Sequence, residues 1–289
     1  MKEVSDSLAG RCAIVSLPGL TVREIRSSGW SPTDLHAQAE LVVRGAFPEL
    51  WADRSIPSRE FYRSYVATYL ERDLRQLLRV GNLRDFERFL RACAARSSQT
   101  VNKSELARDV GISQTTAGEW LSALEASHQI ILLEPFFSNV GKRLVKSPKL
   151  YFRDTGLLSF LLGVTPEALG ASPLTGALWE NLVFSELATW LDYFRPEWTL
   201  WFYRDQQQHE ADFLVQGPWN RIRVLDAKWS ENPPKQAFSS CEVVAGILER
   251  AHDITETEIG LISRSTRNHR VGAKRTLVSA FKVAGYLSD

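Results

Sequence analysis

The stretch QHEADFLVQGPWNRIRVLDAK at residues 208–228 decides the fold of the second half of the chain. Two apolar runs flank the turn-forming segment 216–220, so this stretch predicts a hairpin of two strands, 208–215 and 221–228. Asp226 and Lys228 are two residues apart on the second strand, and their side chains therefore point to the same side. Asp212 lies on the neighbouring strand, where we expect it near Asp226.

The elements around this hairpin predict a mixed α/β domain. An apolar-rich helix at 176–190 carries Glu180, which we expect to point at the same spot as the two aspartates. A strand at 200–203 comes between that helix and the hairpin. The later segments 235–248, 259–262 and 271–284 alternate between helix and strand.

Glu180, Asp212, Asp226 and Lys228 are the residue types of a metal-dependent phosphodiesterase. Carboxylates are the hard oxygen ligands that Mg²⁺ prefers, so we expect Asp212, Asp226 and Glu180 to hold this ion. The metal would polarise a phosphate and lower the pKa of a bound water, while Lys228 positions the water or stabilises the developing charge. The alternative interpretation is a set of edge charges and salt bridges, because D-x-K alone occurs by chance in many strands.

Residues 101–152 predict a winged helix. A helix with Ser104 as N-cap, a turn at Gly111 and a second helix at 114–127 form a helix-turn-helix, and strands at 130–137 and 150–152 form a hairpin. The second helix contains glutamates and no cation, which argues against base reading by that helix. We expect phosphate contacts from the four cations of the wing: Lys142, Arg143, Lys146 and Lys149.

A second basic segment lies near the C-terminus. Residues 264–275 contain five cations and no acid, including Arg267 and Arg270, and predict a phosphate-binding track. DNA is therefore an expected partner. The formal net charge of the whole chain is only +1, because acidic residues elsewhere balance these segments.

Composition bounds the rest of the interpretation. The 289 residues, 44 % hydrophobic and 24 % charged, indicate two or three globular domains. Three scattered cysteines, no signal peptide and no long apolar run predict a cytoplasmic protein without a membrane span. The sequence has no phosphate loop, so we expect no ATP binding or hydrolysis by this chain. Asp154-Thr155-Gly156 predicts a helix cap and not an aspartic-protease site, because no second copy exists.

Several blocks resemble the family of the domain of unknown function 4143 (DUF4143). Segments 61–73, 106–117 and 146–157 are similar to its helical and winged-helix motifs, and 176–181 and 209–213 to its last two motifs. Members usually carry an AAA-type ATPase module before this region. The resemblance therefore implies a truncated protein, with ATP bound only by an absent or separately encoded N-terminal module.

The resemblance also implies a domain plan and a nuclease-like fold. Residues 1–54 would be the ATPase remnant, 55–165 a helical winged-helix domain, and 166–289 a domain of the PD-(D/E)xK nuclease type. In that motif Asp212 matches the first acid, Asp226 the second, Lys228 the lysine and Glu180 the helical acid. The usual proline before the first acid is Ala211 here.

The sequence and the family resemblance together allow two functions. The first is a nucleic-acid-associated module with a nuclease-like domain, either active or degenerate. The second is a non-catalytic docking or oligomerisation module of a split ATPase, for which the aromatic content and the apolar residues near the N-terminus would supply a contact surface.

Overall fold

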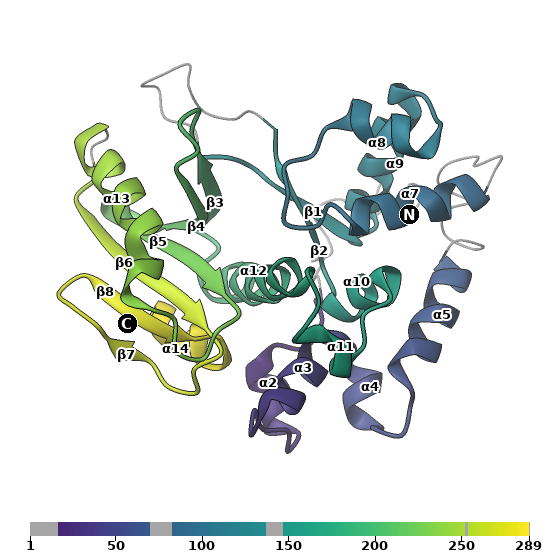
Figure 1. Cartoon of the computed structure of the whole chain (residues 1–289), viewed down its shortest axis with the longest axis horizontal. Helices are drawn as coiled ribbons and strands as arrows, with labels where there is room; N and C mark the ends of the chain where they lie inside the picture. Colours follow the sequence, from purple (N-terminus) through teal and green to yellow (C-terminus); the bar gives the residue numbers. More distant parts are fainter. Residues whose placement is uncertain (1–16, 70–82, 137–146, 252–253, 289) are drawn as a thin grey trace, which may run out of the picture.

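The computed structural model describes residues 17–69, 83–136, 147–251 and 254–288. A six-stranded sheet lies on one side of the molecule and a group of helices on the other, with helix α12 (Thr175–Phe194) between them (Figure 1). The fold is therefore mixed α+β, which agrees with the expected order of a helical part followed by a mixed α/β domain. Within the described ranges, no helix is both long enough and apolar enough to cross a membrane.

The sheet is built around the predicted hairpin and has the strand order β3-β4-β5-β6-β8-β7. Strands β3, β4 and β5 form an antiparallel meander, and β6 and β8 continue parallel to β5. The parallel step from β5 to β6 needs a crossover, which helix α13 supplies. The elements are β3 (Thr199–Arg204), β4 (Glu210–Gln216), β5 (Arg221–Lys228), α13 (Ser239–Ala251), β6 (Glu256–Ser263), β7 (His269–Arg270) and β8 (Arg275–Ser279).

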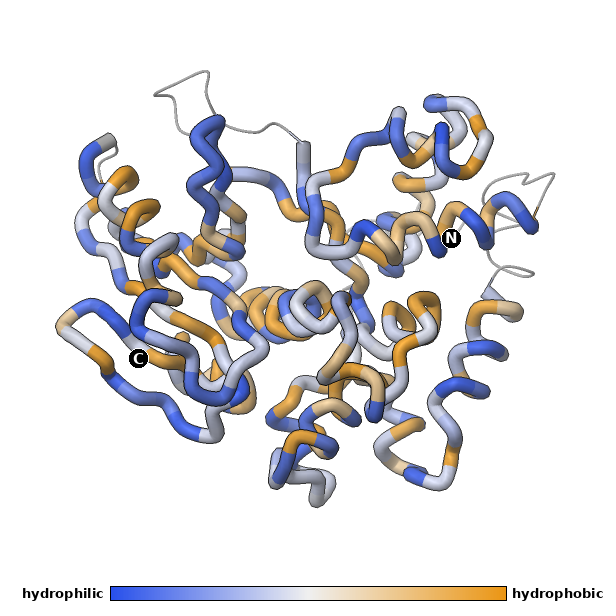
Figure 2. The backbone as a smooth tube through the Cα atoms, in the orientation of Figure 1, coloured by the Kyte–Doolittle hydropathy of each residue, from blue (hydrophilic) through white to orange (hydrophobic). Residues whose placement is uncertain are grey.

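Helices cover both faces of this sheet. Successive side chains of a strand point to opposite faces, and Phe213 and Leu214 of β4 illustrate the result. Phe213 packs against Phe184 of α12, whereas Leu214 belongs to a separate cluster with Val244 of α13. Figure 2 shows α12 as a largely hydrophobic segment at the centre of the molecule, which fits a helix packed against both the sheet and the helical part.

In the helical part, two consecutive helices are joined by a short turn, as the sequence predicts, and the strands Ile130–Leu133 and Lys149–Phe152 pair antiparallel. The first of these strands ends at Leu133, short of the predicted 137. Helix α8 begins after Asn102, whose side chain accepts from the backbone N of Ser104 at 3.0 Å, so Asn102 and not Ser104 is the N-cap. Gly111 ends α8 with φ at 82°, and Ser113 caps α9 by accepting from Thr116 N. The described elements are α7 (Leu83–Ala94), α8 (Lys103–Val110), α9 (Gln114–Ala126), β1 (Ile130–Leu133) and β2 (Lys149–Phe152).

The other α-helices of the described residues are α2 (Val22–Ser27), α3 (Leu35–Arg44), α4 (Pro48–Ala52), α5 (Ser58–Thr68), α10 (Thr155–Leu162), α11 (Pro166–Leu169) and, near the C-terminus, α14 (Val283–Ser288). Of these, α3, α10 and α14 pack against α12. One hydrophobic cluster joins residues of all three expected segments, among them Val22, Phe89 and Trp179. The boundaries at 54 and 165 stay predictions.

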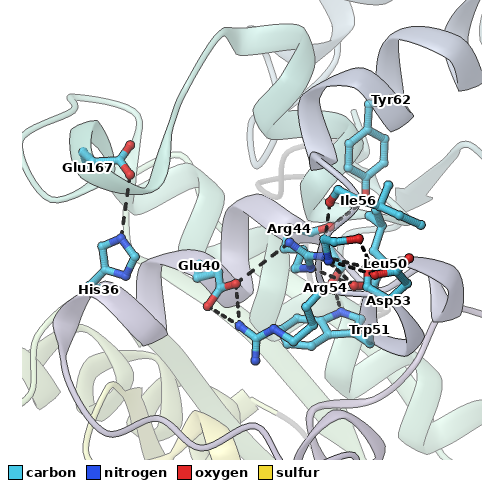
Figure 3. Close-up of polar contacts among 12 residues, drawn as sticks. His36, Glu40, Arg44, Leu50, Trp51, Asp53, Arg54, Ile56, Tyr62 and Glu167 are labelled. Carbon is cyan, nitrogen blue, oxygen red and sulfur yellow. Dashed lines mark hydrogen bonds and ion pairs between the residues drawn. The ribbon is translucent and has the colours of Figure 1, made fainter.

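The turn after α3 is held by polar contacts. The guanidinium of Arg44 donates twice to the carbonyl of Leu50, from Nε at 2.8 Å and from Nη2 at 2.7 Å (Figure 3). The Tyr62 hydroxyl donates to the carbonyl of Arg44, and the Trp51 indole donates to that of Gly45. These bonds satisfy the buried carbonyls where the chain reverses.

Asp154, at the start of α10, also contacts the turn after α3. Its carboxylate accepts from the backbone N of Leu157 at 2.7 Å, which confirms the predicted helix cap. The other oxygen accepts from Ala46 N at 2.7 Å and so ties α10 to the turn after α3. Burial raises the pKa of Asp154, although these hydrogen bonds oppose the shift.

Candidate active site

Asp212 and Asp226 meet across strands β4 and β5. The backbone N of Asp212 donates to Asp226 Oδ1 at 3.1 Å, and Ala227 N donates to Asp212 Oδ2 at 2.9 Å. The expected proximity of the two acids is therefore present. Burial, followed by the charge of Asp212, raises the pKa of Asp226 to about 6.

Lys228 lies on the side of β5 that its spacing from Asp226 predicts. Its Nζ is 3.7 Å from Asp226 Oδ2, and nearly half of its side chain is exposed. Burial lowers the pKa of this ammonium, but the charges of Asp226 and Asp212 outweigh that effect and raise it. A charged, partly exposed ammonium beside two carboxylates can bind an anionic group of a ligand.

Glu180 reaches the cluster from the second turn of α12. The Tyr151 hydroxyl donates to Glu180 Oε1 at 2.6 Å. Burial and the charge of Asp212 together raise the pKa of Glu180, and the neighbouring ammonium of Lys149 opposes the shift. The Lys149 ammonium contacts both Glu180 and Asp212. The four residues expected from the sequence, Glu180, Asp212, Asp226 and Lys228, are therefore connected through it.

Lys149 is the member of this group that we did not expect. Its Nζ lies 2.7 Å from Glu210 Oε1, 3.1 Å from Glu180 Oε1 and 3.5 Å from Asp212 Oδ1. The side chain is only 2 % exposed. Burial lowers the pKa of Lys149, but the charges of these three carboxylates hold it well above its usual range.

The position of Lys149 corrects its assignment as an exposed wing cation. Pairing of β2 with β1 places Lys149 opposite Leu133, and its side chain turns inward to the carboxylates. One sequence signal could have found it. Lys149 and Tyr151 are two residues apart on a strand and so share a face, and both contact Glu180.

The other expected phosphate contacts lie away from the cluster or outside the described residues. Lys142, Arg143 and Lys146 fall in the segment 137–146, which the structure does not describe. Arg267 and Arg270 are exposed, and β6 and β8 separate β7, which carries Arg270, from β5. At the usual strand spacing these elements put Arg270 about 14 Å from β5.

The carboxylates have the right chemistry for Mg²⁺, but their arrangement does not fit it. Their hard oxygens suit the ion, yet the Lys149 ammonium already lies among the oxygens of Glu180 and Asp212. A divalent ion there would lie against this buried positive charge. In the part of the chain that the structure describes, no group of three or more His, Cys, Asp or Glu side chains is arranged to hold a metal ion.

The family comparison agrees with the expected resemblance. Residues 175–276 match the model of DUF4143, a domain of unknown function. The chain therefore carries a DUF4143 region at residues 175–276. The DUF4143 match contains Glu180, Asp212, Asp226 and Lys228, whereas residues 35–168 match a second model, DUF8612, also a domain of unknown function. The blocks 61–73, 106–117 and 146–157, which we expected to belong to DUF4143, fall instead in the DUF8612 match, together with Lys149.

Two curated mycobacterial proteins are similar to this chain. The uncharacterised proteins Rv2008c of Mycobacterium tuberculosis and Mb2031c of Mycobacterium bovis are each 40 % identical to it over 214 residues. The similar region covers 73 % of this chain and 46 % of each relative. The chain thus spans about half the length of the curated relatives it matches.

Proposed function

We propose that the DUF4143 region is a nuclease-like domain of the PD-(D/E)xK type that acts on, or binds, the phosphodiester backbone of nucleic acids. The element order α12-β3-β4-β5-α13-β6 supports this proposal, since it supplies a helix, a three-stranded meander and a parallel fourth strand. The single observation that carries it is the pair of hydrogen bonds, Asp212 N to Asp226 Oδ1 and Ala227 N to Asp212 Oδ2, that holds the two carboxylates together beside Lys228.

The side chains suggest distinct roles toward a phosphodiester. Lys228 is charged and partly exposed, so it would bind a non-bridging phosphate oxygen and stabilise negative charge that develops there. The hydrogen bonds from the backbone N of Asp212 and of Ala227 fix the Asp226 and Asp212 carboxylates relative to this ammonium. The expected role of Glu180, Asp212 and Asp226 as Mg²⁺ ligands would require the Lys149 ammonium to leave the oxygens of the first two, so the proposed roles do not depend on a metal.

A cleavage and binding assay tests this proposal. The purified chain is incubated with supercoiled plasmid in Mg²⁺ or Mn²⁺, and its affinity for a labelled duplex is measured in parallel. Nicking that is lost in both Lys228→Ala and Asp226→Asn would support an active site. Lys235→Ala, which removes an exposed lysine outside the cluster, should leave nicking unchanged.

Two results would contradict the proposal. One is nicking that survives in Lys228→Ala, because the activity would then come from elsewhere. The other is the absence of both cleavage and duplex binding. Binding without cleavage would support the same domain as a degenerate nuclease used for recognition.

The second candidate is a docking module that pairs with another copy of this chain. An apolar hollow of about 590 Å³ is lined by Leu20, Trp190 and Phe194, among others. Leu17 and Phe194 at this hollow are 85 % and 57 % exposed, respectively, and exposed apolar side chains favour an interface. Light scattering of the wild type and of Leu17→Ser/Phe194→Ser tests this. A monomer in both samples would contradict docking between copies.

A further inference from the structure

Lys149 is a buried cation aimed at three carboxylates. Its Nζ contacts Glu180, Glu210 and Asp212, each within 3.5 Å, and also lies 5.5 Å from the centre of the Phe202 ring. A buried ammonium is tolerated only where opposite charge and hydrogen bonds compensate it. The carboxylates and Lys149 therefore depend on each other.

The backbone of Lys149 is fixed on both sides. Strand β2 pairs with β1 through Lys149 and Leu133, and Thr100 bridges to Lys149 on the opposite side. The next residue is also held, because Leu150 N donates to Gln99 O at 3.0 Å. The ammonium is thus delivered to the cluster by a rigid strand that lies outside the DUF4143 match.

We propose that Lys149 is the built-in cation of this site, taking the place between Glu180 and Asp212 that a divalent metal ion would otherwise take. Metal would bind only when the ammonium has left or has been replaced. This inference rests on the proposed function, because it concerns control of the same carboxylates. Two positive charges among the same oxygens repel each other strongly in a buried site, so the two cations exclude each other.

Manganese binding to lysine variants tests the exclusion. Mn²⁺ alone is the probe, and its binding is followed by electron paramagnetic resonance and by the rise in Tm on adding MnCl₂. We expect Lys149→Met to bind one Mn²⁺ at least about tenfold more tightly than the wild type does, with a rise in Tm of roughly 3 °C or more at saturation. Asp212→Asn added to Lys149→Met should abolish both changes, and Lys235→Met should behave as the wild type.

Loss of Lys149 leaves buried acids uncompensated and can unfold the protein. The double variant Lys149→Met/Glu210→Gln removes one of these charges and keeps Glu180, Asp212 and Asp226, so the same comparison can be made on it. A further comparison, between the wild type and Asp212→Asn, needs no lysine variant. We expect Mn²⁺ binding to be the same in the wild type and in Asp212→Asn.

Two outcomes overturn the inference. The first is Mn²⁺ binding by the wild type that is lost in Asp212→Asn, because metal and ammonium would then coexist. The second is a folded Lys149 variant that binds Mn²⁺ no better than the wild type does. The nuclease proposal fails separately. Mn²⁺ binding by the Lys149 variants, with neither cleavage nor duplex binding by the wild type, would refute only that proposal. Wild-type cleavage with metal at Asp212 would refute only the exclusion.

Discussion

The side-chain amide of Asn181 binds both backbone groups of Phe152: Asn181 Oδ1 accepts from Phe152 N and Asn181 Nδ2 donates to Phe152 O, each at 2.8 Å. Asn181 is fully buried, and its Oδ1 also accepts from the Ser97 hydroxyl at 2.8 Å. Asn181 lies in the DUF4143 match and Phe152 in the DUF8612 match. One amide therefore couples the two matched regions and fixes the strand that carries Lys149.

Replacing this amide should destabilise the fold strongly. Asn181→Leu keeps a similar volume but leaves the Phe152 backbone and the Ser97 hydroxyl buried without partners, which should lower the free energy of unfolding by roughly 3 kcal/mol or more. Urea denaturation followed by circular dichroism measures this change. Ser185→Ala, one turn further along α12, removes weaker bonds and should cost below about 1 kcal/mol. If both variants lose the same free energy of unfolding, the Asn181 amide contributes no more to stability than the Ser185 hydroxyl does.

Gly45 and Gly111 provide a matched pair for backbone strain. Both have positive φ, 75° and 82°, which an alanine adopts only at a cost. A Cβ on Gly45 would also collide with the Tyr62 hydroxyl and the Asp154 carboxylate, whereas one on Gly111 would meet open space. We expect Gly111→Ala to lower the free energy of unfolding by about 1 kcal/mol and Gly45→Ala by roughly 3 kcal/mol or more.

Thermal and urea unfolding of the two alanine variants would check this difference. If Gly45→Ala costs no more than Gly111→Ala, the turn after α3 can relax, and the contacts of Tyr62 and Asp154 do not constrain it. Gly156→Ala separates the cost of the collision with Tyr62 from the cost of a positive φ. Its Cβ would meet the same Tyr62 hydroxyl, but its φ is not positive.

The sequence predicts local features well where the pattern itself carries the signal. Strand β5 has the predicted bounds because alternation and a turn define it, and the spacing of Asp226 and Lys228 places them together. Lys149 was misassigned because its partners are 31 or more positions away in the chain. Next to Lys142, Arg143 and Lys146 it looks like part of a solvated basic run, and only the fold turns it inward.

Glu186 should make stability depend on pH. Burial raises its pKa to about 8, although its Oε1 accepts from Val22 N at 2.8 Å. Between the unfolded value near 4.5 and about 8, the folded state holds a proton that the unfolded state has lost. Stability from this group is therefore present at low pH and falls as the pH rises through that window.

The variant Glu186→Gln isolates this effect and keeps an acceptor for Val22 N. From pH 5 to pH 8 the wild type should lose roughly 2–4 kcal/mol more in free energy of unfolding than Glu186→Gln does. Urea denaturation at several pH values measures the difference. Glu197→Gln removes an exposed carboxylate and should reproduce the wild-type profile. A Glu186→Gln profile that runs parallel to the wild type would contradict the assignment.

The exposed arginines near the C-terminus should determine the salt dependence of nucleic-acid binding. If Arg267 and Arg270 each contact a phosphate, Arg267→Ala/Arg270→Ala should reduce the slope of log affinity against log salt by about 2. The loss should be similar for duplexes of different sequence, because phosphate contacts carry no base information. Fluorescence anisotropy with labelled duplexes at several salt concentrations measures both quantities.

A charge-matched control separates contact from general attraction. Arg54→Ala/Arg221→Ala removes the same two positive charges, but from arginines that pair with Glu40 and Glu256. A general field effect would lower the affinity in both double variants alike, whereas direct phosphate contacts change the slope only when Arg267 and Arg270 are lost. An unchanged slope in Arg267→Ala/Arg270→Ala would leave the segment 142–146, with Lys142, Arg143 and Lys146, as the expected phosphate-binding surface to be mutated next.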